Sequence, residues 1–217
     1  MSISIKDDIS SANDNPEFKP DDKYVSNHFL LFARLSWYRV LSFTTTAKRG
    51  FYLGELLPGI VRIDDSNNVL IIKNNGRVSD AIELEQENYT PGSLAKTIQN
   101  RLMEDKVLGR RRLQVREEEG RLKIISGTFG NSSTIDIEPG PDKDLSSLGL
   151  KDGTSTPGED VAGSIGNVEA TGRGQLLVGA KDSNTEGLRL FVTLSEDEVV
   201  DEQEATVNIS KGVAVKL

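Results

Sequence analysis

The stretch that decides the fold runs from Asp160 to Leu194 and reads DVAGSIGNVEATGRGQLLVGAKDSNTEGLRLFVTL. Short apolar or alternating runs in it are separated by glycine-containing turns, which is typical of antiparallel β structure. Gly166-Asn167 suits a tight turn between strands expected at 161–165 and 168–170, because both residue types tolerate positive φ. The segment 171–175 is expected to break the chain again.

The remainder of this stretch continues the same pattern. Leu176–Val178 is a short apolar strand, 182–187 is a loop, and Leu188–Leu194 alternates like a half-buried strand. The acidic run Glu196–Glu204 is expected to be an exposed loop before a last strand. We therefore predict a β-rich module over 151–217, with residues 151–159 as a linker rich in Gly, Thr, Ser and Asp.

The preceding segment, 60–150, has the pattern of an α+β module. Val69–Lys73 and Ala81–Glu85 are expected to pair around a turn at Asn74-Asn75-Gly76. Thr90 and Pro91 predict a helix start, and the helix is expected over 91–104. Its apolar stripe would consist of Leu94, Ala95, Ile98, Leu102 and Met103.

Three further elements complete this module. Residues 113–116 and 121–126 are expected to form a hairpin around Glu117–Gly120, and 133–138 to add a strand. Residues 142–148 are expected to make a short helical turn with Leu145 and Leu148 on one side. The predicted fold class is α+β: mainly antiparallel β with one amphipathic helix, in two small β-rich modules.

The N-terminal quarter has a different character. Residues 1–23 are rich in Ser, Asp, Asn, Lys and Pro, so we expect a disordered leader. Residues 24–59 form an unassigned apolar segment, bounded by Pro58-Gly59. Between Tyr24 and Phe51, the spacing of Leu31, Leu35 and Tyr38 slightly favours a helix, although Val40–Thr46 fits a strand equally well. Trp37 and Tyr38 are interpreted as core residues rather than a recognition surface.

Composition excludes several function classes. The 217 residues carry 34 acidic and 26 basic side chains, a net charge of −8 that disfavours general nucleic-acid binding. The absence of cysteine excludes disulfides and thiolate zinc sites, and a single histidine disfavours most histidine-based metal or acid–base sites. No apolar run approaches the length of a membrane span, and no signal peptide is visible.

Four patterns were weighed as candidate sites. Arg110–Arg112 could clamp a phosphate, but Glu117–Glu119 across the expected hairpin favour a solvated, charge-paired patch. His28 has no spaced partner, and the acids at Asp152 and 159–160 lack calcium-loop spacing. Gly172-Arg173-Gly174 is only part of a dinucleotide fingerprint. We therefore assign no catalytic, cofactor-binding or metal residues and expect no enzyme.

A family resemblance lies in several of these segments. DVAGSIGNVEATGRGQLL (160–177), EGLRLFVT (186–193) and ATVNISKGVAVKL (205–217) resemble the middle region of the flagellar hook-associated protein 2 family, the filament-capping proteins. Upstream, YTPGSLAKTIQNRL (89–102), GRLKIISGTFGNSSTIDI (120–137) and DLSSLGLKDGT (144–154) extend it to about two thirds of the chain.

The resemblance implies a structural and assembly protein of the bacterial flagellum. Its partners would be flagellin, other axial proteins and neighbouring cap subunits, and it would lie outside the cell after export without a cleaved signal peptide. The coiled-coil segments that flank this region in the family have no counterpart here, so we expect a truncated or diverged relative without a stable ring. The alternative is a surface adhesion module that binds host glycans or mucus.

Overall fold

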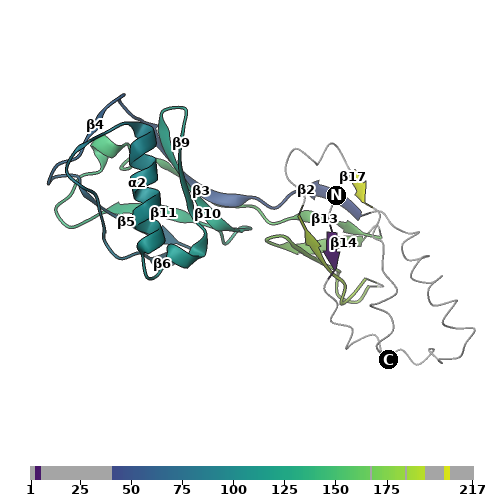
Figure 1. Ribbon diagram of the computed structural model, residues 1–217. Helices are drawn as coiled ribbons and strands as arrows, with labels where there is room; N and C mark the ends of the chain where they lie inside the picture. The colour runs from purple at the N-terminus through teal and green to yellow at the C-terminus, as the bar shows by residue number, and fades with distance from the viewer. Residues whose placement is uncertain (1–2, 6–40, 167, 184, 194–202, 206–217) are drawn as a thin grey trace, which may run out of the picture. The chain divides into compact units, whose positions relative to one another are not determined.

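The chain forms two compact units, one inserted into the other. This computed structural model describes residues 3–5, 41–166, 168–183, 185–193 and 203–205 (Figure 1). Residues 48–159 form one unit, here called the inserted unit, and residues 1–47 with 160–217 form the other, here called the split unit. The chain thus passes between the units twice.

The inserted unit is an α+β structure with two main antiparallel sheets. The first sheet has the strand order β12-β3-β10-β9. In the second sheet, β5 lies between β11 and β6, and β7 also pairs with β5. The strands β4 and β8 form a separate pair. Their bounds are β3 Arg49–Leu56, β4 Val61–Arg62, β5 Val69–Asn74, β6 Arg77–Val78, β7 Ile82–Glu83, β8 Asn88–Tyr89, β9 Gln114–Glu118, β10 Arg121–Phe129, β11 Ile135–Pro139 and β12 Thr154–Thr156. Two short 3-10 helices, η3 Gly109–Arg111 and η4 Ser146–Leu148, join them.

The α-helix of the inserted unit, α2, spans Pro91–Glu104, as the sequence predicts. It begins there because the Thr90 hydroxyl accepts from the Ser93 amide (3.2 Å) and the Ser93 hydroxyl accepts from the Thr90 amide (2.9 Å), which satisfies two otherwise unpaired donors. It packs against β7, β8, β9 and β10 and crosses in front of the strands in Figure 1. Gln99 bonds both Val115 N–H (2.6 Å) and Leu113 C=O (3.3 Å), so the helix covers the outer edge of β9.

One continuous apolar core holds the inserted unit together. Leu94, Ile98 and Leu102 from α2 are at most 1% exposed, and they belong to the same cluster as Leu70, Ile72, Leu122 and Ile124 from the sheets. Met103, which the sequence pattern placed on the buried stripe, is 65% exposed. Met103 is five residues after Ile98, and residues five apart on a helix point about 140° away from each other around its axis. Because Ile98 faces the core, Met103 faces solvent.

The split unit is a single antiparallel sheet in its described residues. Its strand order is β1-β16-β15-β14-β13-β2-β17. The bounds are β1 Ile3–Ile5, β2 Leu41–Thr45, β13 Ala162–Ile165, β14 Val168–Arg173, β15 Leu176–Val178, β16 Arg189–Val192 and β17 Gln203–Ala205. Val161, Leu177, Leu190 and Val192 are at most 2% exposed and form its buried side. The hairpin β13–β14, with Gly166 at φ +58°, confirms the predicted turn.

The two crossing points between the units are bonded to each other. Lys48 and Glu159 form a β-bridge with backbone bonds of 2.9 and 3.2 Å, and their side chains make an ion pair at 3.1 Å. The ends of the inserted unit therefore lie side by side. Close packing continues there, since a Cβ on Gly50 would lie 1.9 Å from the Ser133 carbonyl oxygen.

Several sequence predictions are corrected by these pairings. Residues 151–159 are not only a linker, because β12 pairs with β3 there. Residues 171–173 do not break the chain, because β14 continues through Arg173 to pair with β15. The slight preference for helix within 24–51 is wrong for its described part, where β2 and the start of β3 are strands. Leu31, Leu35 and Tyr38, on which that preference rests, lie outside the described residues. Pro58-Gly59 lies inside the inserted unit rather than at a unit limit.

The remaining N-terminal and C-terminal predictions fall largely outside the described residues. Of the expected leader 1–23, only Ile3–Ile5 is described, and it is a strand paired with β16. Trp37, Tyr38 and most of the acidic run 196–204 lie outside the described residues. The observed units, 48–159 and its discontinuous partner, also differ from the expected ranges 60–150 and 151–217.

Candidate functional site

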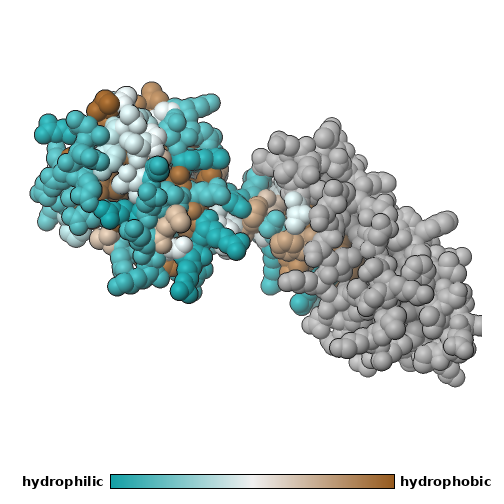
Figure 2. All heavy atoms as spheres, viewed as in Figure 1, coloured by the Kyte–Doolittle hydropathy of each residue, from teal (hydrophilic) through white to brown (hydrophobic). Residues whose placement is uncertain are grey.

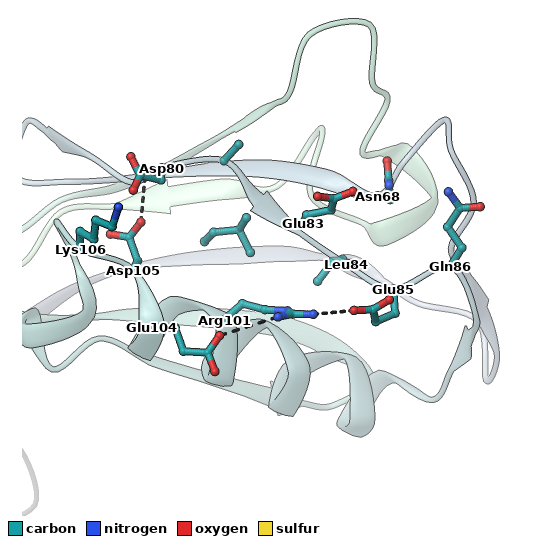
Figure 3. Close-up of a pocket in the computed structure, with 12 residues that line it drawn as sticks. Asn68, Asp80, Glu83, Leu84, Glu85, Gln86, Arg101, Glu104, Asp105 and Lys106 are labelled. Carbon is teal, nitrogen blue, oxygen red and sulfur yellow. Dashed lines mark hydrogen bonds and ion pairs between the residues drawn. The ribbon is translucent and has the colours of Figure 1, made fainter.

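One surface hollow of the inserted unit is an open groove of about 750 Å³ between the chain around β7 and the end of α2 (Figure 3). One wall is the continuous run 80–86 with Asn68 beside it. The other wall consists of Arg101, Glu104, Asp105 and Lys106. The groove is therefore built from two segments about 20 residues apart in the sequence.

Local sequence explains the strand-side wall. Ile82 and Leu84 are buried at 4% and 1%, and Ala81, Glu83 and Glu85 between and beside them are exposed. This alternation turns the apolar side chains toward the core and the acids toward solvent. β7 is held by pairing of Val69 with Glu83 and of Leu70 with Ile82.

Most charged groups in the groove are already paired. Arg101 extends from α2 to the carboxylate of Glu85 at 2.6 Å and lies 3.7 Å from Glu104. One carboxylate oxygen of Asp105 accepts a hydrogen bond from the Asp80 N–H (2.8 Å). The other oxygen accepts hydrogen bonds from the N–H groups of Val107 and Leu108. Five acidic side chains against two basic ones nevertheless leave the groove acidic.

One buried group in the groove has no partner. Asn68 is only 4% exposed, and its side-chain oxygen Oδ1 makes no hydrogen bond. Most buried polar atoms in folded proteins are satisfied, so an unpaired acceptor in a groove wall requires an explanation. Figure 3 shows Asn68 and Glu83 on the strand side of the groove, opposite the helix.

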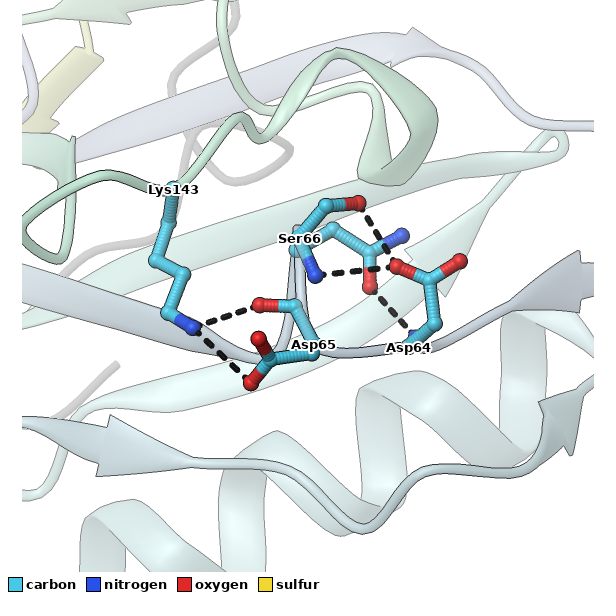
Figure 4. Close-up of polar contacts among 5 residues, drawn as sticks. Asp64, Asp65, Ser66 and Lys143 are labelled. Atoms are coloured by element: carbon cyan, nitrogen blue, oxygen red, sulfur yellow. Dashed lines mark hydrogen bonds and ion pairs between the residues drawn. The ribbon is translucent and has the colours of Figure 1, made fainter.

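A second polar cluster joins two loops of the inserted unit (Figure 4). Asp64 accepts from both the amide (2.9 Å) and the hydroxyl (2.6 Å) of Ser66, and these bonds lower the pKa of Asp64 from its usual value of 3.8. Lys143 donates to the backbone and side chain of Asp65. Every group in this cluster has a structural partner, so we interpret it as a loop clamp.

The same arrangement recurs at the second loop. Asp144 accepts from the amide and hydroxyl of Ser146, which lowers the pKa of Asp144 from its usual 3.8. Asn67 bridges the loops through bonds to the Arg62 carbonyl (2.9 Å) and the Ser147 hydroxyl (2.7 Å). Aspartate two residues before serine is thus a turn-forming device here.

The surface of the inserted unit is largely hydrophilic, with few exposed apolar residues (Figure 2). Two of them, Leu56 at 67% and Ile60 at 59% exposed, flank the turn that contains Pro58-Gly59. The adjacent Leu57 is buried and its amide bonds the Gly120 carbonyl (2.9 Å), so this turn is fixed against the β9–β10 hairpin tip.

The arginine cluster has a different environment from the predicted one. Arg110 and Arg111 belong to η3 and Arg112 follows it, at the start of the β9 hairpin; Glu117–Glu119 lie at its turn. A strand of this length separates Arg112 from Glu118 by about 20 Å. Glu118 pairs instead with Arg116 (3.1 Å) and Lys123 (2.9 Å), whereas Arg110 and Arg112 are exposed, as expected of a solvated patch.

The other weighed positions are structural where they are described. Gly172 lies inside β14, where a Cβ would meet the Val161 carbonyl oxygen at 1.7 Å, so this glycine is required by backbone packing. Asp160 accepts the Gly174 amide (2.5 Å), which closes the turn after β14. Asp152 lies in the bend before β12, and His28 is outside the described residues.

Neither a metal-binding cluster nor a membrane-spanning helix occurs in the described part of the chain. No group of three or more histidine, aspartate or glutamate side chains there could hold a metal ion. No helix among these residues is long and apolar enough to cross a membrane. The groove, which sequence reasoning missed, is thus the best-defined candidate site.

Comparison with known proteins gives similar solved structures but no close relative. No family model matches the sequence, and no curated protein matches it. Similar structures include the flagellar cap protein FliD from Bdellovibrio bacteriovorus, with 13% identity, coverage of 72% of this chain and 84% of that one, and a TM-score of 0.42.

Two further structures are of the same kind of protein. The FliD D1-D2-D3 domains from Escherichia coli show 15% identity, coverage of 79% of this chain and 49% of that one, and a TM-score of 0.46. FliD from Pseudomonas aeruginosa shows 14% identity, coverage of 81% and 80%, and a TM-score of 0.44. This chain is thus similar to solved flagellar cap proteins and spans about half of the Escherichia coli structure.

Proposed function

We propose that this protein is a structural and assembly component resembling the flagellar filament cap, which contacts flagellin or neighbouring cap subunits at the filament tip. It would work outside the cell, and its action would be binding and positioning of protein surfaces rather than catalysis. The observation that carries the proposal is the resemblance of 160–177 and 186–193 to the filament-capping family. These residues supply the strands β13 to β16 of the split unit.

The architecture supports a binding role in a second way. An inserted unit with closed, bonded ends can carry variable surface features without disturbing the sheet that holds it. The Lys48–Glu159 bridge provides such a closure. The acidic surface implied by the net charge of −8 would favour partners with basic patches and make binding sensitive to salt.

A pull-down with the purified full-length chain tests this proposal. We expect flagellin or another axial protein from flagellated source cells to be retained at low salt and reduced at high salt. The control is the same chain after thermal unfolding, which should retain neither. Recovery of no axial protein at either salt concentration, with binding to immobilised mucin instead, would replace the cap proposal by the adhesion module.

Self-association is tested separately, by light scattering at micromolar concentration. We expect at most weak association of this chain through its strand edges, because exposed edges can pair between molecules. A compact ring-sized particle would show that the β-rich units suffice for assembly.

A further inference from the structure

The outer edge of β7 is an unpaired strand edge inside the groove. The Leu84 amide donates to the Asn68 carbonyl (2.8 Å), and on the far side of β5 the Val69 carbonyl accepts from Gly140 (3.0 Å). Backbone groups in an antiparallel pair alternate between facing the partner and facing away. Because Val69 faces Gly140, its cross-strand neighbour Glu83 must turn its N–H and C=O away from β5. Within the described chain, no bond outside the ladder involves Glu83.

The groups around this edge would be satisfied by a ligand that carries hydrogen-bond donors and positive charge. Glu83 has no ion-pair partner among the described residues, whereas Glu85 and Glu104 contact Arg101. Asn68, at most 4% exposed, supplies the unpaired acceptor oxygen Oδ1 in the same wall. That oxygen is buried, so the Asn68 amide must rotate about its soft terminal torsion before a ligand in the groove can reach it. A ligand with N–H groups and cationic side chains would satisfy all three features.

We propose that this groove binds an extended, basic segment of another protein chain, which adds as a strand to the outer edge of β7. Its backbone would exchange hydrogen bonds with the N–H and C=O of Glu83. A Lys or Arg side chain of the segment would pair with the Glu83 carboxylate, and a second such side chain, extended across β7, would donate to Asn68 Oδ1. Strand addition of this kind gives affinity through the main chain and specificity through alternate side chains.

A metal ion fits this groove less well. The carboxylates are spread along both walls, two of them contact Arg101, and no triad of metal-binding side chains exists among the described residues. A nucleic-acid backbone is disfavoured by the excess of acids lining the groove. A charged edge can also serve simply to prevent strand pairing between molecules. That role would not explain the unpaired oxygen of Asn68, and it predicts that an added peptide does not bind.

The proposal is tested with the full chain and a fluorescent peptide in which lysine alternates with valine or threonine. Anisotropy should show saturable binding, and a peptide with glutamate in place of lysine should not bind. Glu83→Arg should weaken binding at least about tenfold, because it places like charges together. Glu169→Arg is the matched control, since Glu169 is exposed on β14 in the split unit and should leave the affinity unchanged.

Two further readouts distinguish strand addition from diffuse attraction. A lysine peptide methylated at alternate backbone nitrogens keeps its charge but loses donors, so it should bind at least about tenfold more weakly. Bound peptide should slow hydrogen exchange of the amides in 81–86. Asn68→Leu removes an unpaired buried polar group, so folding stability should be unchanged or increased while peptide affinity falls.

Three results would overturn the proposal. The lysine peptide could fail to bind, which would show that the acidic edge only prevents pairing. The methylated peptide could bind equally well, or Glu169→Arg could weaken binding as much as Glu83→Arg; either would indicate non-specific charge attraction. Because the peptide is not flagellin, these results leave the proposed cap function to its own test.

Discussion

Replacement of Ile98 by alanine tests the packing that holds the groove in place. Ile98 is 0% exposed, at the centre of the α2 face that meets the sheets, with Leu94 and Leu102 one turn away on either side. The substitution removes three buried carbon atoms. Their transfer contributes about 2.4 kcal/mol at roughly 0.8 kcal/mol each. A residual cavity in so closed a core adds to this, so we expect a loss of about 3 to 5 kcal/mol.

The assay is hydrogen exchange of the α2 amides in increasing urea, which reports on the inserted unit because α2 lies there. Met103→Ala is the matched control on the same helix: Met103 is 65% exposed, so its loss should change stability by no more than about 0.5 kcal/mol. An Ile98→Ala midpoint equal to that of Met103→Ala would refute the assignment of Ile98 to the core.

Three further predictions concern single features of the fold. Thr90→Ala removes the N-cap of α2 and should cost about 1 kcal/mol in the same assay. Gly172→Ala forces a Cβ within 1.7 Å of a carbonyl oxygen and should destabilise the split unit by about 1 to 3 kcal/mol in thermal unfolding, whereas Gly59→Ala, with open space around it, should be nearly neutral. Folding lowers the pKa values of Asp64 and Asp144 from their usual value of 3.8. The ionised carboxylates therefore stabilise the fold above pH 3.8, and this stabilisation is lost as the pH falls through their lowered pKa values in the folded protein. Urea midpoints should therefore fall below about pH 4, and Ser66→Ala should destabilise more at pH 7 than at about pH 2; an equal effect at both would contradict this.

Elements governed by local signals could be predicted from the sequence. Thr90-Pro91 with the spacing Leu94, Ile98, Leu102 is enough to predict that α2 begins at Pro91 and ends near Glu104. The turn at Asn75-Gly76 has φ of +52° and +75°, values that these residue types adopt readily, and it lies where the sequence indicates.

Elements governed by distant pairing could not be predicted. β12 has the composition of a linker, and it is a strand only because β3, about 100 residues earlier, offers Tyr52 and its neighbours as partners. The Tyr52 hydroxyl donates to the Leu150 carbonyl (2.7 Å), which fixes that approach. The groove was missed because its second wall is the end of α2. The pairing of β7 with β5 follows the expected pairing of 69–73 with 81–85, but no sequence pattern places Asp105 beside Asp80.

Insertion of one unit into the other couples their stabilities, and this gives a last prediction. The inserted unit contains 112 residues, 48 to 159, and when folded it holds Lys48 and Glu159 in contact. If it unfolds, the split unit must close a flexible loop of that length, which costs about 4 kcal/mol of chain entropy. The split unit should therefore lose stability whenever the inserted unit unfolds.

Hydrogen exchange in increasing urea measures this coupling directly. In Ile98→Ala, at a urea concentration that unfolds only the inserted unit, amides of β13 to β15 should exchange up to about a thousandfold faster than in the unmutated chain, the equivalent of about 4 kcal/mol. In Met103→Ala at the same concentration they should stay protected. The outcome depends on loop closure alone, since Ile98 belongs to the core of the inserted unit. Unchanged protection of β13 to β15 beside an unfolded α2 would show that the two units fold independently despite their shared crossing points.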